Sequence, residues 1–176
     1  MLKRFSLLLL LVCIPITNIY PQDKVDLLFR ILKFEKSLMT RAKGKVNIAV
    51  VYNNNSGSSA REALEISKQI SNTKDKKVQN YDVNHKIILM DRYIEDKIKD
   101  SCVVYICKNI DEEKIIDIAK KHKILTVASD KSYFQKVAIV IREDDNTNKF
   151  YINVEILKDE GVNIAKELLS ISKIYE

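Results

Sequence analysis

Short apolar runs alternate along this chain with stretches in which apolar residues recur every three or four positions. Residues 25–42 show the second pattern, which predicts one amphipathic helix that ends near Gly44. Residues 46–52 show the first, a β-branched run typical of a buried strand. Runs of the same kind, which predict further core strands, cover residues 85–90, 102–107 and 124–128.

Helical patterns separate these strands. Ser59-x-x-Glu62 has the form of a capping box and predicts a helix that continues to Ile70. A short helix is expected over residues 92–99, and Asp111 is the expected N-cap of another that includes Ala119. Strands that alternate with helices in this way predict an α/β fold with a mostly parallel central sheet and helices on both faces.

The last forty residues break the alternation. Residues 137–141 and 150–154 read as two strands joined by a turn-rich connection, which predicts an antiparallel hairpin. A closing helical region is expected from Glu155 to Tyr175, divided at Gly161, with Asn163 as the N-cap of its second part. We therefore expect a single α/β domain over residues 23–176.

The first 22 residues differ from the rest. A basic start is followed by an apolar run over residues 5–16, which is too short to span a bilayer and has the length of a secretory signal core. This pattern predicts a Sec-type signal peptide over residues 1–22 and export to the periplasm. A retained anchor is one alternative. Lipidation at Cys13 is another, although the residue before an acylated cysteine is normally small and here is Val12.

Charge and cysteine content narrow the function classes. Removing Lys3 and Arg4 from 30 basic residues leaves 28 against 24 acidic ones, a net charge of +4 on the exported chain. The lysines are interleaved with acids, so no nucleic acid partner is expected. Cys102 and Cys107 lie five apart in one predicted strand and point to opposite faces, which argues against a bridge between them. Two buried free thiols are expected, with a bridge to another subunit or partner as the alternative.

Catalytic residues are scarce. The chain has two histidines and none of the common zinc, nucleophile-elbow or EF-hand motifs, so we expect no enzyme, no cofactor and no metal site. The loop at residues 53–59 has one glycine and is expected to be an ordinary turn, with an anion site as the rarer alternative. An enzyme would require Asp91, Asp130 and His85 to meet in one cleft.

Six segments and Phe134 carry a family resemblance. The segments are residues 27–34, 46–52, 102–106, 124–130 and 150–154, and Leu168-Leu169-Ser170-Ile171. In these segments the chain resembles the YfiR/HmsC-like family of bacterial periplasmic proteins, and the resemblance covers nearly all of residues 23–176. Two departures stand out. Gln135-Lys136-Val137 replaces a glycine, and Ser37-Leu38-Met39 replaces a tryptophan-proline pair that often follows the first helix.

The resemblance implies a periplasmic regulator that holds a membrane diguanylate cyclase inactive and thereby lowers cyclic di-GMP. The implied partner is the periplasmic domain of that membrane protein, membrane contact would come through the partner or through lipidation at Cys13, and a homodimer is left open. A periplasmic module that binds a small molecule or ion is the alternative. The residues that match the family motif, for which we expect structural roles, are Phe34, Cys102, Asn153, Gly161, Leu168 and Leu169.

Overall fold

One eight-stranded sheet organises the molecule, with the strand order β2-β3-β1-β4-β5-β6-β7-β8. The structure is a computed structural model, and it describes residues 23–74, 76–144 and 147–175. The eight strands are β1 Lys45–Tyr52, β2 Lys77–Val78, β3 Tyr81–Leu89, β4 Val103–Ile106, β5 Leu125–Ala128, β6 Ile139–Asp144, β7 Thr147–Asn153 and β8 Lys173–Tyr175. The helices are α1 Lys24–Lys33, α2 Leu38–Ala42, α3 Gly57–Asn72, α4 Ile94–Ile98, α5 Glu113–His122, α6 Val154–Asp159 and α7 Lys166–Leu169, with a 3₁₀ turn, η1, at Lys131–Tyr133.

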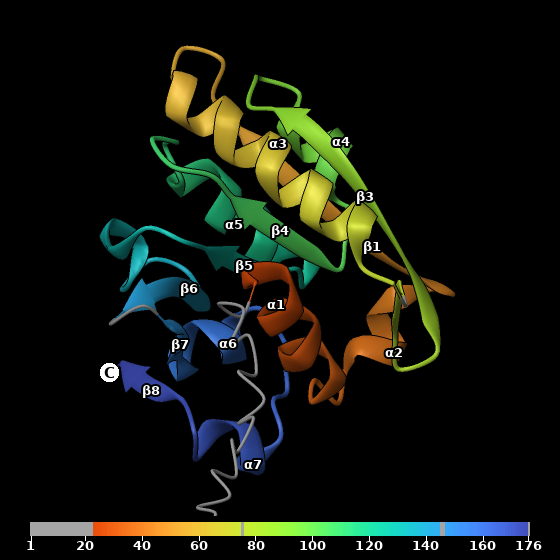
Figure 1. Ribbon diagram of the computed structural model, residues 1–176. Helices are drawn as coiled ribbons and strands as arrows, with labels where there is room; N and C mark the ends of the chain where they lie inside the picture. Colours follow the sequence, from red (N-terminus) through yellow and green to blue (C-terminus); the bar gives the residue numbers. More distant parts are fainter. Residues whose placement is uncertain (1–22, 75, 145–146, 176) are drawn as a thin grey trace, which may run out of the picture.

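Five neighbouring strands of the sheet, in the order β3, β1, β4, β5 and β6, are parallel. Every residue of β4 and β5 is buried. Helices α1 and α3 cover one face of the sheet, and α4 and α5 cover the other (Figure 1). Strands that are covered on both faces need continuous apolar sequences, which explains the runs of β-branched residues. The expected α/β class is therefore confirmed. So is the antiparallel hairpin, as β6 pairs with β7 from Ile139 opposite Ile152 to Asp144 opposite Thr147.

The N-terminal helix is shorter than the sequence predicted. The chain leaves the helix after Lys33 and resumes with the separate helix α2. Between them Glu35 forms an isolated antiparallel bridge with Ile164. The prediction of one helix over residues 25–42 was wrong because residues far along the chain bind the backbone here.

Two expected helix caps were also wrong. Ser56, not Ser59, caps α3 by accepting a hydrogen bond from the Ser59 amide. Glu62 is instead buried, where it accepts hydrogen bonds from the Tyr105 hydroxyl at 3.1 Å and the Lys108 amide at 2.8 Å. Helix α5 begins after Glu112, which makes no side-chain cap bond, so Asp111 does not cap it.

The closing segment is not helical to Tyr175. Helix α7 ends at Leu169, and residues 173–175 form β8, parallel to β7 at the edge of the sheet. Ser170 and Ser172 donate hydroxyl hydrogen bonds to the carbonyls of Glu167 and Leu169, which compete with a continuing helix.

Asn163 is not a helix cap, because α7 begins after Ala165. The backbone of Asn163 pairs instead with residues 35 and 36. The predicted signal peptide at residues 1–22 lies outside the described residues, so it stays a prediction.

Both cysteines of the domain are free and buried, as expected. Cys102 precedes β4 and Cys107 follows it, with exposed fractions of 1% and 0%. Burial raises the pKa of each thiol, which keeps it protonated and unreactive.

We predict that a thiol reagent leaves Cys102 and Cys107 unmodified in the folded protein and labels both in denaturant without reductant. Mass spectrometry of the intact protein measures this directly. Protection that persists in denaturant would mean that the thiols are bridged and would overturn the free-thiol assignment.

Candidate functional site

An apolar groove of about 530 Å³ lies between α1, β7 and the C-terminal segment, residues 164–175. Its apolar lining comes from three separate parts of the chain: Leu27, Phe34, Phe150, Leu168 and Ile171. The remaining lining residues are polar or basic: Arg30, Lys33, Asn148, Lys149 and Lys173. We call this feature the apolar groove.

Two side chains of the apolar groove are unusually exposed for their type. Ile171 is 72% exposed and Phe34 is 45% exposed. Nearby in the chain, Ile174 on β8 is 51% exposed. Single exposed apolar residues are ordinary, but apolar side chains gathered around a concave surface are typical of interaction sites.

The backbone on both sides of Glu35 ties α1 to the C-terminal segment. The Ala165 amide donates to the Phe34 carbonyl at 2.9 Å, and the Lys36 amide donates to the Asn163 carbonyl at 2.7 Å. These bonds flank the bridge between Glu35 and Ile164. They fix Phe34 against the segment that carries Leu168 and Ile171, and so they fix the shape of the apolar groove.

The Glu35 carboxylate is fully buried and anchors this connection. Its Oε1 accepts from the Ser37 amide at 2.8 Å, from the Asn163 amide at 3.2 Å and from the Ser37 hydroxyl. Its Oε2 accepts from Nη2 of Arg41 at 2.6 Å. A buried charge is tolerated only when it is paired and hydrogen-bonded, and here both conditions are met.

Arg41 extends the connection to the central sheet. Its Nη1 donates to the Cys102 carbonyl at 2.8 Å and to the Lys123 carbonyl at 3.2 Å, just before β4 and β5 begin. Gln79, in the turn between β2 and β3, donates to three carbonyls around the end of α1: Leu32, Lys33 and Glu35. Four distant parts of the chain, at Gln79, Cys102, Lys123 and Asn163, therefore meet around the Glu35–Arg41 pair.

A second buried carboxylate lies close to the same segment. Glu160 is fully buried and accepts from the amide and the hydroxyl of Thr126 at 3.0 and 2.5 Å. Burial raises its pKa from 4.5 to about 7, although the two Thr126 hydrogen bonds act in the opposite direction. This carboxyl therefore titrates near neutral pH.

The residues matched to the family motif divide between the apolar groove and its supports. Phe34 and Leu168 line the groove, while Gly161 and Leu169 line a neighbouring hollow of about 390 Å³. Gly161 has a positive φ of 67°, and a Cβ there would lie 3.0 Å from the Lys123 side chain. Asn153 caps α6 by accepting from the amides of Glu155 and Ile156, each at 3.1 Å. Cys102 is buried, and its carbonyl binds Arg41.

Sequence reasoning missed several residues of this region. Glu35 lies three residues after Leu32 and four after Ile31, on the apolar stripe of the predicted helix. A carboxylate at such a position signals a buried charge that needs a partner. Ile171 belongs to a family-matched segment, but it was expected inside a helix that in fact ends at Leu169, and no comparable signal marks Lys173.

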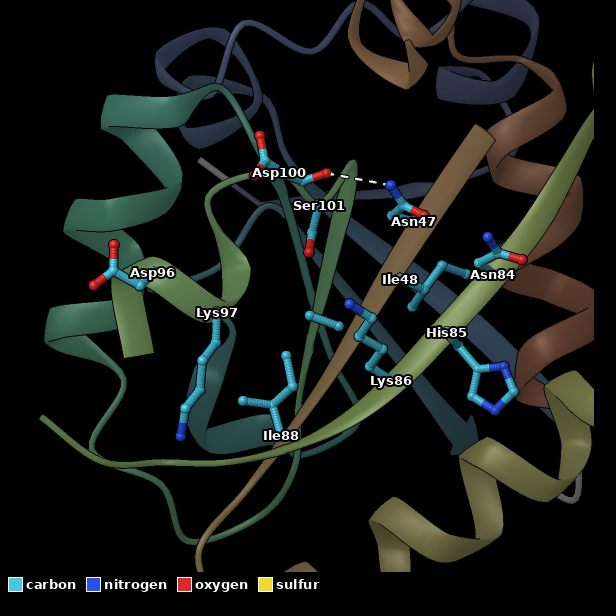
Figure 2. A pocket seen from close by; sticks show the side chains of 11 residues that line it. Asn47, Ile48, Asn84, His85, Lys86, Ile88, Asp96, Lys97, Asp100 and Ser101 are labelled. Carbon is cyan, nitrogen blue, oxygen red and sulfur yellow. Dashed lines mark hydrogen bonds between the residues drawn. The ribbon is translucent and has the colours of Figure 1, made fainter. Parts of the chain in front are cut away.

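A polar hollow lies on the other side of the molecule, on the face of β1 and β3 beside α4 (Figure 2). Its volume is about 280 Å³, below the usual range for pockets that bury a small molecule. Several of its polar groups bind other parts of the chain: the Asn47 amide donates to the Asp100 carbonyl at 3.5 Å, and Lys97 pairs with Asp91 at 2.6 Å. The apolar groove is therefore the stronger candidate for a binding site.

The three residues that an enzyme would require do not converge. Asp91 follows β3 and Asp130 follows β5, which lie three strand spacings apart, or about 14 Å. His85 instead forms a hydrogen bond of 2.8 Å with the Ser67 hydroxyl of α3, and the Asp130 carboxylate caps η1.

Within the part of the chain that the structure describes, no group of three or more His, Cys, Asp or Glu side chains is arranged to hold a metal ion. The described helices include none with the length and apolar character to cross a membrane.

Solved structures with a similar fold include three bacterial proteins. A conserved domain protein from Vibrio cholerae has a TM-score of 0.59 at 14% identity, covering 86% of this chain and 58% of its own. An ABC domain in complex with L-Trp from Streptococcus pneumonia has a TM-score of 0.54 at 10% identity, covering 82% and 60%. CD0873, a substrate binding protein with adhesive properties from Clostridium difficile, in a ligand-free, open structure, has a TM-score of 0.53 at 15% identity, covering 80% and 58%. This chain thus spans about three-fifths of each of these proteins, and at such identities the likeness shows the fold alone.

No match was found among curated proteins. The family comparison is more specific. The model of the YfiR/HmsC-like family matches residues 22–173. This range includes the whole of the apolar groove and every described strand, except for the last two residues of β8. The chain therefore belongs to the YfiR/HmsC-like family.

Proposed function

We propose that this chain is an exported regulator that binds a membrane signalling protein and uses the apolar groove to do so. The observation that carries the proposal is the groove itself, in which Ile171 and Phe34 remain exposed over a buried apolar floor. Membership of a family of periplasmic regulators supports the general role. The separation of Asp91, Asp130 and His85 argues against catalysis by these residues.

The shape of the site suits a protein partner. Ile171 lines the groove and, among the large apolar residues that the structure describes, has the most exposed side chain, at 72%. Fully buried apolar anchors that are surrounded by a polar rim supply most of the affinity at protein interfaces. A partner that covered Ile171 and Phe34 would bury both and would leave the basic residues at the rim.

The regulated protein that we propose is a diguanylate cyclase whose periplasmic domain is the partner. In this proposal the bound chain holds the cyclase inactive, and its release raises cyclic di-GMP. Binding at the periplasmic domain accounts for control without any chemistry by the regulator itself.

We predict that Ile171→Asp abolishes repression while the protein remains folded. An aspartate at this site would bring an unpaired charge into the interface, which should weaken binding by at least about a hundredfold, or roughly 3 kcal/mol. Stability should change little because Ile171 is 72% exposed. The measurement is cyclic di-GMP in a host that lacks the native gene and carries either the wild type or the variant.

Leu64→Asp is the matched control, since Leu64 is a 64% exposed apolar residue on α3 and does not line the groove. It should keep cyclic di-GMP at the wild-type level. If Ile171→Asp, folded and exported at normal amounts, also repressed fully, the groove would not be the regulatory surface.

A further inference from the structure

We infer that two copies of this chain pair through the outer edge of β3, antiparallel about a twofold axis at Ile87, so that their two sheets become one. The inference goes beyond the proposed function, because the apolar groove lies beside β7 and β8, at the opposite end of the sheet. Both grooves of such a dimer therefore remain open to a partner.

Most of the outer edge of β3 has no neighbouring strand. On that side β2 pairs with only the first two residues of β3, and the Val83 amide donates to the Lys76 carbonyl at 2.7 Å. Since alternate residues of a strand direct their amides and carbonyls to the same side, those of residues 85, 87 and 89 point outward as well. Within the described ranges no other segment binds them, and β3 lies at the margin of the molecule (Figure 1). We call the outer side of residues 84–90 the free edge.

The free edge lacks the features that usually prevent edge strands from pairing. It contains no proline, its register with β1 runs without a bulge to Leu89, and Lys86 is its one lysine. Ile87 and Leu89 are 39% and 37% exposed on the face toward α3. His85 lies on the same face, and burial lowers the pKa of its side chain, which is therefore neutral at neutral pH. A long apolar edge of this kind favours the addition of another strand.

The two ends of the free edge limit which strand can bind there. At one end β2 occupies the position beside Val83. At the other end the Met90 amide donates to the Tyr52 carbonyl of β1 at 2.8 Å, and the chain then turns toward α4. The free edge of a second copy has the same length and the same limits, so an antiparallel pair centred on Ile87 uses all of both edges.

The side chains are also matched in this register. Residues 85, 87 and 89 lie opposite residues 89, 87 and 85 of the second copy, which gives about six backbone hydrogen bonds. Ile87 meets its own counterpart, and Leu89 meets His85. On the other face, where Lys86 and Ile88 point toward the side of α4 (Figure 2), these two residues lie opposite each other. No like charges are directly opposed. A shift of two residues would either displace β2 or leave one outward residue of each copy unpaired.

A cysteine at the proposed axis tests the partner and the register together. In Ile87→Cys the two Cα atoms would lie about 5.5 Å apart, within the range of a disulfide. Mild oxidation should therefore convert most of the purified chain into a covalent dimer on a non-reducing gel. Leu89→Cys is the matched control, equally exposed on the same edge, but its two Cα atoms would lie about 14 Å apart or more. It should stay monomeric on the gel, because Cys102 and Cys107 are buried in both variants.

Sedimentation of the protein without cross-linking gives the second measurement. At about 50 µM, above the micromolar range of weak dimers, the wild type should have twice the mass of one chain. Ile87→Lys should have the mass of one chain, because two ammonium groups would face each other across the axis. Ile174→Lys places the same charge on the exposed edge strand β8 and should remain dimeric. Circular dichroism checks that both variants keep the wild-type fold.

A wild type with the mass of one chain would overturn the inference, and so would equal cross-linking at positions 87 and 89. A dimer that persists in Ile87→Lys would place the interface on another surface and would overturn it too. These results are independent of the repression assay with Ile171→Asp. The proposed function can therefore fail while the dimer stands, and the reverse also holds.

Discussion

Replacing Arg41 with alanine is expected to destabilise the protein by about 3–5 kcal/mol, the largest effect that we expect from a single substitution here. The Arg41 side chain is 11% exposed, and the Glu35 side chain that it pairs with is fully buried. Removal of the guanidinium leaves the carboxylate with only the donors from Ser37 and Asn163. The cost is that of a buried charge without its counter-ion. Chemical denaturation followed by circular dichroism measures the loss.

The partner substitution separates lost charge pairing from lost packing. In the Arg41→Ala background, Glu35→Gln removes the orphaned charge and should restore part of the stability, so the two substitutions should be strongly non-additive. Lys97→Ala breaks an exposed pair with Asp91 and should leave the unfolding midpoint close to that of the wild type. If Arg41→Ala were as mild as Lys97→Ala, the pair would not organise the α1 connection.

Arg41→Ala should also make the connection between α1 and the C-terminal segment open more readily than the central sheet. The amides of Lys36 and Ala165 donate across the connection between α1 and the C-terminal segment. Hydrogen exchange at these two amides should accelerate in Arg41→Ala, while amides within β4 and β5 should keep more of their protection.

The second large effect is a dependence of stability on pH that comes from Glu160. Its pKa in the folded protein is about 7, against an ordinary value of 4.5. Because the pKa of Glu160 is higher in the folded than in the unfolded protein, its protonated carboxyl contributes fully to the free energy of unfolding below pH 4.5. This contribution is lost as pH rises through 7. The difference corresponds to roughly 3 kcal/mol between about pH 4 and pH 8.

Glu160→Gln should remove most of this dependence. Glutamine is a close mimic of the protonated acid, since its oxygen can accept from the Thr126 amide and its NH₂ can donate to the Thr126 hydroxyl. The variant should therefore match the wild type near pH 4.5 and exceed its stability at pH 8. Free energies of unfolding across this range provide the comparison. If the free energies of unfolding of the two proteins changed with pH in parallel, Glu160 would already be ionised at low pH, and burial would not control its ionisation.

The central part of the fold was predictable from local patterns. Residues 46–52, 102–107 and 124–128 are β-branched or apolar runs, and each became a buried parallel strand because burial on both faces demands such sequences. The hairpin at residues 139–153 was predictable for a related reason, since turn-forming residues separate two short apolar runs.

The candidate site was only partly predictable, because long-range contacts determine it. Phe34 and Leu168 were identified by family resemblance, and both line the groove. The break in the first helix depends on the bridge between Glu35 and Ile164, which are 129 positions apart, and no local pattern encodes such a contact. The strand β8 depends on the free edge of β7 in the same way. Glu35 was the exception, because a carboxylate on the apolar face of a predicted helix is a signal that local sequence can show.

The most direct test of the proposed function places a photo-crosslinking amino acid at position 171, or at position 64 as the control, and irradiates living cells. The account predicts a product at position 171, absent at position 64, that joins this chain to a membrane protein with a periplasmic domain and a cyclase domain. Mass spectrometry of the product identifies that protein. Equal products from both positions, or a position-171 product with no membrane signalling protein, would contradict regulation through the apolar groove.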